Sequence, residues 1–181
     1  HSDDLIREDV IAQSLWLCKS LLDHDVTNLP ETNALMALMC LHTSRFNSRL
    51  DANGEIVLLS EQDRSKWDKE LIEAGSKYIY ASQFGKHLSS YHLEAAISFE
   101  HCLAEDYDST NWERIVIHYD ALLRIHYDPV VDLNRCIAIL EHKGVEEALN
   151  AINKIQNQKQ LLNYYLFYNI RAEIFERAGE H

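Results

Sequence analysis

The stretch from Thr110 to Gly144 constrains the fold of this chain more than any other. Its apolar residues recur at helical spacing on both sides of Asp128-Pro129, and proline suits the first position of a helix, where its missing N–H costs nothing. Thr110 and Glu113 have the spacing of a capping box at the start of the first helix. Gly144 can adopt the left-handed conformation that ends the second helix. The stretch therefore predicts two helices joined by a proline turn.

The same pattern recurs, imperfectly, at the end of the chain. Apolar residues lie seven and four positions before Gly144 and again before Gly179, namely Ile137 and Leu140, then Ala172 and Phe175. The two glycines are 35 residues apart, close to the period of about 34 residues of tetratricopeptide repeats, in which a glycine separates the two helices. The spacing and the shared apolar phase together predict repeat-like helix hairpins.

Composition agrees with an all-helical chain. Hydrophobic residues make up 46% of the 181 residues, which is enough for a sizeable core, and there are only five glycines and two prolines. No segment has the composition of a linker. We therefore expect one domain over residues 1–181, with N-terminal helices in 5–109 and repeat-like hairpins in 110–181, the last of them truncated.

Apolar periodicity predicts six further helices, at residues 5–23, 31–46, 61–82, 89–105, 145–155 and 161–178. Ser60 is the expected cap of the third of these. Residues 47–59 break the rhythm, because Asp51-Ala52-Asn53-Gly54 is a turn sequence and the next five residues favour extended backbone. The predicted fold is all-α, an antiparallel array of helix hairpins like a tetratricopeptide superhelix, with a small β-hairpin or ordered loop near 47–59.

The charge and the cysteines limit the function classes. Seventeen basic and 29 acidic residues give a net charge of −12, which argues against binding to a nucleic-acid backbone. The four cysteines are widely spread without a CxxC motif, so we interpret them as small core residues, with a disulfide or metal role as the alternative. The sequence shows no apolar run of about 20 residues, the length of a membrane span, and no signal peptide, so we expect a cytoplasmic protein that does not contact the membrane.

No pattern in the sequence predicts catalysis, a cofactor or a metal ion. The ten histidines lack ligand spacing: His87 and His92 are five residues apart, whereas positions three or four apart share a helix face. There is no HExxH motif, no pair of ExxH motifs, no glycine-rich phosphate loop and no nucleophile elbow. We therefore predict no catalytic, cofactor-binding or metal-binding residue.

The densest polar cluster is EQDRSKWD, residues 61–68. It has a functional interpretation, as a recognition surface or an acid–base pair of Asp63 with Asp68. It also has a structural interpretation, as the start of a helix. Acidic side chains would then lie near the positive end of the helix dipole, and Arg64 and Asp68 would form an i, i+4 pair. Two further polar sites stand out: Arg45, at the end of the apolar helix expected at 31–46, and Asn134-Arg135, inside an otherwise apolar helix. The candidate network, between repeats or at a partner site, comprises Arg45, Asp63, Arg64, Trp67, Asp68, Asn134 and Arg135.

Seven segments occur in an order and spacing that resemble a known family. They are LMALMCL (35–41) with Arg45, DANGEIVLL (51–59), DRSKWD (63–68), IEAG (72–75), YHLEAAI (91–97), YDAL (119–122) and PVVDLNR (129–135). Together they resemble the C-terminal tetratricopeptide-like extension of bacterial extracytoplasmic-function (ECF) RNA polymerase sigma factors, over about residues 5–179. Family members carry DNA- and polymerase-binding sigma regions before this extension, and nothing in this sequence resembles those regions.

The resemblance implies that the parent protein acts in transcription initiation and that this chain is its regulatory or protein-interaction part. The implied partners are the sigma regions of the same polypeptide, RNA polymerase, or both, with DNA contacted only through the sigma regions. Two alternatives stay open: a free-standing helical-repeat adaptor, which the length of the natural reading frame would reveal, and an all-helical metal-dependent enzyme, which metal analysis would reveal.

Overall fold

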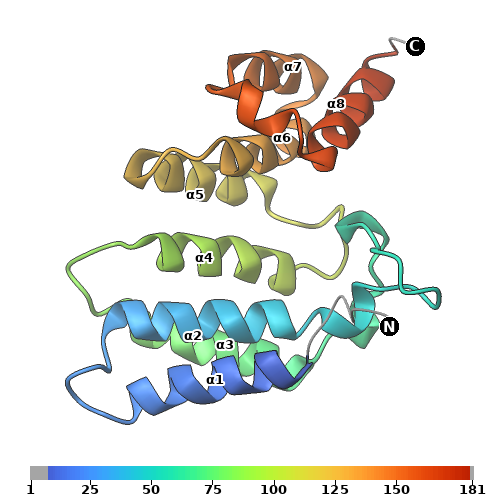
Figure 1. The fold of residues 1–181 in the computed structure, drawn as a ribbon. Helices are drawn as coiled ribbons and strands as arrows, with labels where there is room; N and C mark the ends of the chain where they lie inside the picture. The colour runs from blue at the N-terminus through green and yellow to red at the C-terminus, as the bar shows by residue number, and fades with distance from the viewer. Residues whose placement is uncertain (1–7, 180–181) are drawn as a thin grey trace. The chain divides into compact units, whose positions relative to one another are not determined.

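The computed structural model describes residues 8–179, and these form an all-α structure that confirms the predicted fold class (Figure 1). The described residues contain no β-strand and eight α-helices. Their bounds are α1 Glu8–Leu22, α2 Pro30–Thr43, α3 Lys69–Ser82, α4 Ser90–Leu103, α5 Trp112–Ile125, α6 Pro129–Lys143, α7 Val145–Lys154 and α8 Tyr165–Ala178. The predicted start of the first helix at residue 5 lies outside the described residues.

The chain divides into two compact units, His1–Thr110 and Asn111–His181. The boundary falls one residue after the position where the sequence changes from N-terminal helices to repeat-like hairpins. Each unit has its own set of packed helices, α1–α4 in the first and α5–α8 in the second.

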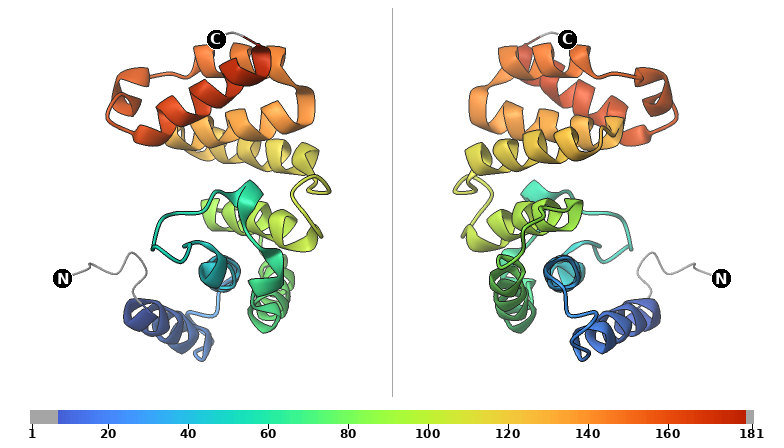
Figure 2. Two further views of the ribbon diagram at one scale, coloured as in Figure 1. Left: turned by 90° about the vertical axis from the view of Figure 1, so that its right-hand side faces the viewer. Right: turned by 90° about the vertical axis from the view of Figure 1, so that its left-hand side faces the viewer.

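Helix α2 is the centre of the first unit, where it packs against α1, α3 and α4 (Figure 2). Its small and apolar side chains Ala34, Ala37 and Leu41 are fully buried, as expected for a helix that is apolar on all sides. Gly75 of α3 lies so close to α2 that an added Cβ would come within 2.8 Å of Leu41 Cγ. The absence of a side chain at this glycine therefore lets the two helices approach closely.

The second unit begins with the predicted helix–proline–helix element. Asp128 caps α6 by accepting hydrogen bonds from the N–H groups of Val130 and Val131, and Pro129 occupies the first helical position. Gly144 ends α6 with φ +94° and ψ −173°, so its φ is positive as predicted, but its ψ is extended and α7 begins at the next residue. Helix α6 packs against α5, α7 and α8 around the buried Leu133 and Cys136.

Three expected helix boundaries are wrong. The helix expected at 61–82 begins at Lys69, because Asp68 rather than Ser60 is its N-cap and accepts from the N–H groups of Glu70 and Leu71. Thr110 does not cap α5; Asn111 does, accepting from Arg114 N–H. The last helix begins at Tyr165 rather than 161, after a short 3₁₀ turn, Gln158–Leu161.

The interruption at 47–59 is an ordered loop rather than a β-hairpin. It follows a 3₁₀ turn, Phe46–Ser48, and has one antiparallel bridge, Leu50 to Ile56. The turn between the bridge residues depends on Asp51, whose carboxylate accepts from the N–H groups of Asn53 and Glu55, and on Gly54, which has φ +80°. Asx-turn chemistry and a glycine with positive φ therefore explain why the helical rhythm stops here.

Candidate functional site: an arginine–tryptophan cluster

The polar segment 61–68 forms two tight turns instead of the first turns of a helix. A 3₁₀ turn at Leu59–Glu61 is followed by a second at Arg64–Lys66. Asp63 caps the second turn by accepting from Ser65 N–H, at 3.0 Å, and Asp68 caps α3. Both carboxylates are exposed and serve as caps, and the premise of an i, i+4 pair between Arg64 and Asp68 is wrong because the α-helix begins after both residues.

Trp67 is the buried centre of the site. Its side chain is 4% exposed, and its indole Nε1–H donates to Ser48 Oγ at 2.8 Å. Two guanidinium groups lie within cation–π range of its ring: Arg64 Cζ is 4.8 Å and Arg45 Cζ 5.1 Å from the ring centroid. We call Arg45, Ser48, Gln62, Arg64 and Trp67 the arginine–tryptophan cluster.

Arg64 connects this cluster to the end of α4. Its Nη1 donates to the carbonyl oxygens of His101, at 2.6 Å, and Ala104, at 2.8 Å, and its Nη2 donates to Thr110 Oγ1 at 3.3 Å. The last carbonyls of a helix lack intrahelical partners and carry partial negative charge. A cation at this position therefore satisfies and stabilises the C-terminus of α4.

Arg45 connects the cluster to the ordered loop. Its guanidinium is buried and donates to Gln62 Oε1 through Nε, at 3.4 Å, and Nη2, at 3.3 Å. The amide of Gln62 in turn donates to the carbonyl oxygen of Val57 at 3.2 Å. Ser48 Oγ–H donates to the carbonyl oxygen of Arg45 at 2.8 Å. The cluster thereby fixes residues 45–67 against α4 through side-chain contacts.

Burial and the two guanidinium groups keep His101 of α4 uncharged. Burial, with the positive charges of Arg45 and Arg64, lowers the pKa of His101 from 6.5 to about 3. The imidazole is therefore neutral at physiological pH. Among the described residues, no three His, Cys, Asp or Glu side chains are grouped so that they could hold a metal ion.

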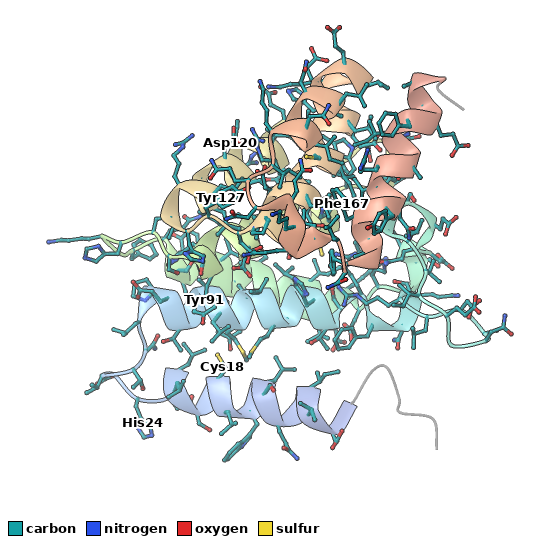
Figure 3. The ribbon with its side chains drawn as sticks, turned by 45° about the horizontal axis from the view of Figure 1, so that its top comes forward. Cys18, His24, Tyr91, Asp120, Tyr127 and Phe167 are labelled. Carbon is teal, nitrogen blue, oxygen red and sulfur yellow. The ribbon has the colours of Figure 1, made fainter. Side chains whose placement is uncertain are left out.

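Asn134 and Arg135 belong to the second unit and take part in a different network. Arg135 Nε donates to the Asp120 carboxylate, and its Nη1 lies 3.5 Å from Asp132 Oδ1. Tyr127 O–H donates to Asp132 Oδ2 at 3.1 Å, and the phenol oxygen accepts from the N–H of Gln156 at 2.7 Å. Figure 3 labels Asp120 and Tyr127. This network joins α5, α6 and the segment after α7, while Asn134 is half-buried on α6.

Sequence reasoning found Arg45, Arg64 and Trp67 but missed their partners. Ser48 and Gln62 are common polar residues in a loop, and the two carbonyls that accept from Arg64 are backbone groups 37 and 40 residues away. No local pattern signals such contacts.

All four cysteines are free thiols, and three of them are buried, as expected of small core residues. Burial is the main cause that raises the pKa of Cys40 to about 11 and that of Cys136 to about 12. Cys18 and Cys40 share an apolar cluster with Met36 and Leu22. At neutral pH these thiols are protonated and chemically unreactive.

Comparison with known proteins gives two matches. A family of unknown function, DUF6596, matches residues 1–83. An uncharacterized protein of Rhizobium meliloti (strain 1021) is 35% identical over 150 residues, which cover 83% of this chain and 35% of that protein. The chain thus spans about a third of the length of this relative. No solved structure matches. Within residues 8–179, none of the helices combines the length and the apolar character needed to cross a membrane.

Proposed function

We propose that this chain is the regulatory, protein-interaction part of an ECF-type RNA polymerase sigma factor and acts in transcription initiation in the bacterial cytoplasm. The observation that carries the proposal is the run of seven sequence segments, from 35–41 to 129–135, in the order and spacing of that family's C-terminal extension. An all-α structure of packed helices supports it, because helical arrays offer extended surfaces for other proteins.

The size of the bacterial relative also supports the proposal. Its 150 matched residues are 35% of its length, so it is more than twice as long as this chain. The remainder is long enough for further domains, which typically have about 50–250 residues. DNA- and polymerase-binding sigma regions are the domains that the proposal requires there.

In this proposal the arginine–tryptophan cluster acts by positioning. It anchors an ordered loop whose apolar side chains Ile56 and Leu58 are 62% and 52% exposed. The acidic Asp51, Glu55 and Glu61 are exposed on the same segment. A rigid loop with apolar and acidic groups suits contact with a basic protein surface, such as the sigma regions of the same polypeptide or the polymerase.

The test is promoter-dependent transcription by RNA polymerase core enzyme with the full-length factor. We expect Arg45→Ala and Arg64→Ala to lower transcription or its regulation, whereas Lys66→Ala, which changes an exposed lysine beside the cluster, leaves both unchanged. Thermal melting of each variant separates a folding defect from a lost contact. Normal melting with normal transcription for both arginine variants would reject the positioning role.

The natural reading frame provides a separate test of the sigma-factor assignment. We expect it to extend upstream by about 150 residues or more, which is the size of one or two domains. A full-length protein without such an extension would instead be a free-standing adaptor. Transcription independent of the upstream regions would also contradict the assignment.

A further inference from the structure

Six large apolar side chains are exposed at one end of the first unit. Two come from the loop between α1 and α2, and four from the end of α3, the following loop and the start of α4. They are Val26 (86% exposed), Leu29 (49%), Tyr80 (65%), Phe84 (75%), Leu88 (59%) and Tyr91 (41%). We call them the loop-end patch. Figure 1 shows the two loops on the left of the first unit, and the right-hand panel of Figure 2 looks onto this end.

The two loops form one surface because they touch. Gly85 packs on Pro30, where an added Cβ would come within 2.8 Å of the proline Cγ. Tyr80 and Phe84 pack edge to face, with ring centroids 5.5 Å apart. The contact between the two loops and the ring pair therefore hold the patch together, and large exposed apolar patches mark interaction sites.

The patch differs in charge from the rest of its unit. Residues 1–110 contain 19 acidic and 9 basic residues, so this unit carries −10 of the −12 net charge. The only acidic or basic residues in the patch segments 23–29 and 83–91 are Asp23, Asp25 and Lys86. Asp23 forms an ion pair with Lys19. Charge repulsion between two copies of the chain is therefore low at this end.

We propose that the loop-end patch is a self-association surface and that its partner is a second copy of this chain, paired about a two-fold axis. A two-fold contact places the same patch on both sides. We place the axis between the two loops, so that each α1–α2 loop faces the partner's α3–α4 loop. In that register the exposed Asp25 and the exposed Lys86 lie on facing loops, so their opposite charges favour pairing across the interface.

Aromatic side chains supply much of the area of the patch. An aromatic side chain buries about 150–250 Å², so Tyr80, Phe84 and Tyr91 at these exposures offer roughly 350 Å² per copy, to which Val26, Leu29 and Leu88 add. Stable interfaces bury about 800 Å² per partner and are enriched in Tyr and Phe at the centre. The aromatic content and the size both fit a modest, reversible dimer. This inference goes beyond the proposed function and does not depend on it.

Sedimentation equilibrium of the 181-residue chain over about 5–300 µM tests the proposal, because dissociation constants in the micromolar range correspond to a modest dimer. We expect a monomer–dimer equilibrium that Phe84→Ser weakens at least tenfold. Trp16→Ser is the matched control, because Trp16 is 68% exposed on α1 of the same unit, and it should leave the equilibrium unchanged. A chain that stays monomeric, or a dimer that Phe84→Ser does not weaken, overturns the proposal.

A charge swap tests the two-fold register. Asp25→Lys and Lys86→Asp should each weaken the dimer, and the double variant should restore it, because the pair is re-formed with opposite sign. All four positions changed in these tests are exposed, so the variants should keep the circular dichroism and melting temperature of the parent chain. A double variant no tighter than the single variants would overturn the two-fold pairing.

Discussion

Arg64 makes hydrogen bonds to residues 37, 40 and 46 positions further along the chain. It bonds the carbonyls that end α4 and the hydroxyl of Thr110 while its guanidinium covers Trp67. We expect Arg64→Ala to lower the free energy of unfolding by about 1.5–3 kcal/mol, the range for hydrogen bonds to a charged group. Urea denaturation measures this change.

The matched control for Arg64 is Lys66, two residues away. Its side chain is 60% exposed, and its ammonium nitrogen lies 3.9 Å from the Asp63 carboxylate. Exposed pairs of this kind contribute little, so Lys66→Ala should change the free energy of unfolding by less than about 0.5 kcal/mol. Equal effects of the two substitutions would contradict the role assigned to Arg64.

His101 makes stability depend on pH. Its pKa in the folded chain is about 3, against 6.5 in the unfolded chain, so between these values the unfolded state binds a proton that the folded state does not. Stability from this residue is therefore intact above pH 6.5 and falls with decreasing pH by up to about 1.4 kcal/mol per pH unit. Unfolding of His101→Gln should show a shallower loss between pH 6.5 and 4.

The exposed His87 serves as the control for this pH effect. A His87→Gln variant makes the same substitution at an exposed position, and its unfolding is measured over the same pH range. If His101→Gln and the parent chain lose stability with the same slope, His101 is not the cause of the acid sensitivity.

At the scale of the helix, His92 shows how α4 begins. The N–H of Ser89 donates to His92 Nδ1 at 3.2 Å, and with that tautomer Nε2–H donates to the carbonyl oxygen of Ser82 at 3.2 Å. The imidazole thus has the role that Glu or Gln has at the third position of a capping box, and it also ties α4 to the end of α3.

Two substitutions at His92 should therefore distinguish the loss of the capping hydrogen bond from the loss of the imidazole itself. His92→Ala should destabilise the chain by about 1 kcal/mol, as the loss of a helix cap does, and hydrogen exchange in the first turn of α4 should become faster. His92→Gln should retain most of the stability because its amide can accept from Ser89 N–H. A glutamine variant as unstable as the alanine variant would contradict the capping role.

The helices also show which boundaries a sequence can specify. The predicted start of α6 is correct, because Asp128 and Pro129 act through neighbouring backbone groups. The start of α3 was placed eight residues too early, at 61 instead of Lys69. Residues 61–68 have helical spacing, but the N–H of Asp68 donates to the carbonyl oxygen of Ser44, at 2.8 Å, at the end of α2. A tertiary contact thus competes with the local helical preference and prevails.

At the scale of the whole molecule, charge predicts what the isolated chain does not bind. A net charge of −12, of which the first unit carries −10, makes the approach of a phosphate backbone unfavourable. We expect no specific binding of the isolated chain to duplex promoter DNA. Fluorescence anisotropy with labelled promoter DNA at low salt checks this, and salt-sensitive binding below about 1 µM would contradict it.

The sequence by itself determined the fold class, because helical periodicity, few glycines and few prolines are properties of neighbouring residues. It also placed the proline turn at 128–129 and the interruption at 47–59, since turn chemistry acts over two to four residues. It selected Arg45, Arg64 and Trp67 because charged and aromatic groups are conspicuous near buried helices.

Only the tertiary structure decided what those residues contact. Trp67 donates a hydrogen bond to Ser48, 19 residues away, and Arg64 donates one to Thr110, 46 residues away. Neither sequence separation corresponds to a helical or strand repeat, so no pattern in the sequence indicates these pairs. The structure also separated Arg135 from this cluster, pairing it with Asp120 in the second unit. The physical reason is that a buried polar group must find a partner wherever the packed helices place one, so its partner depends on the packing and not on the local pattern.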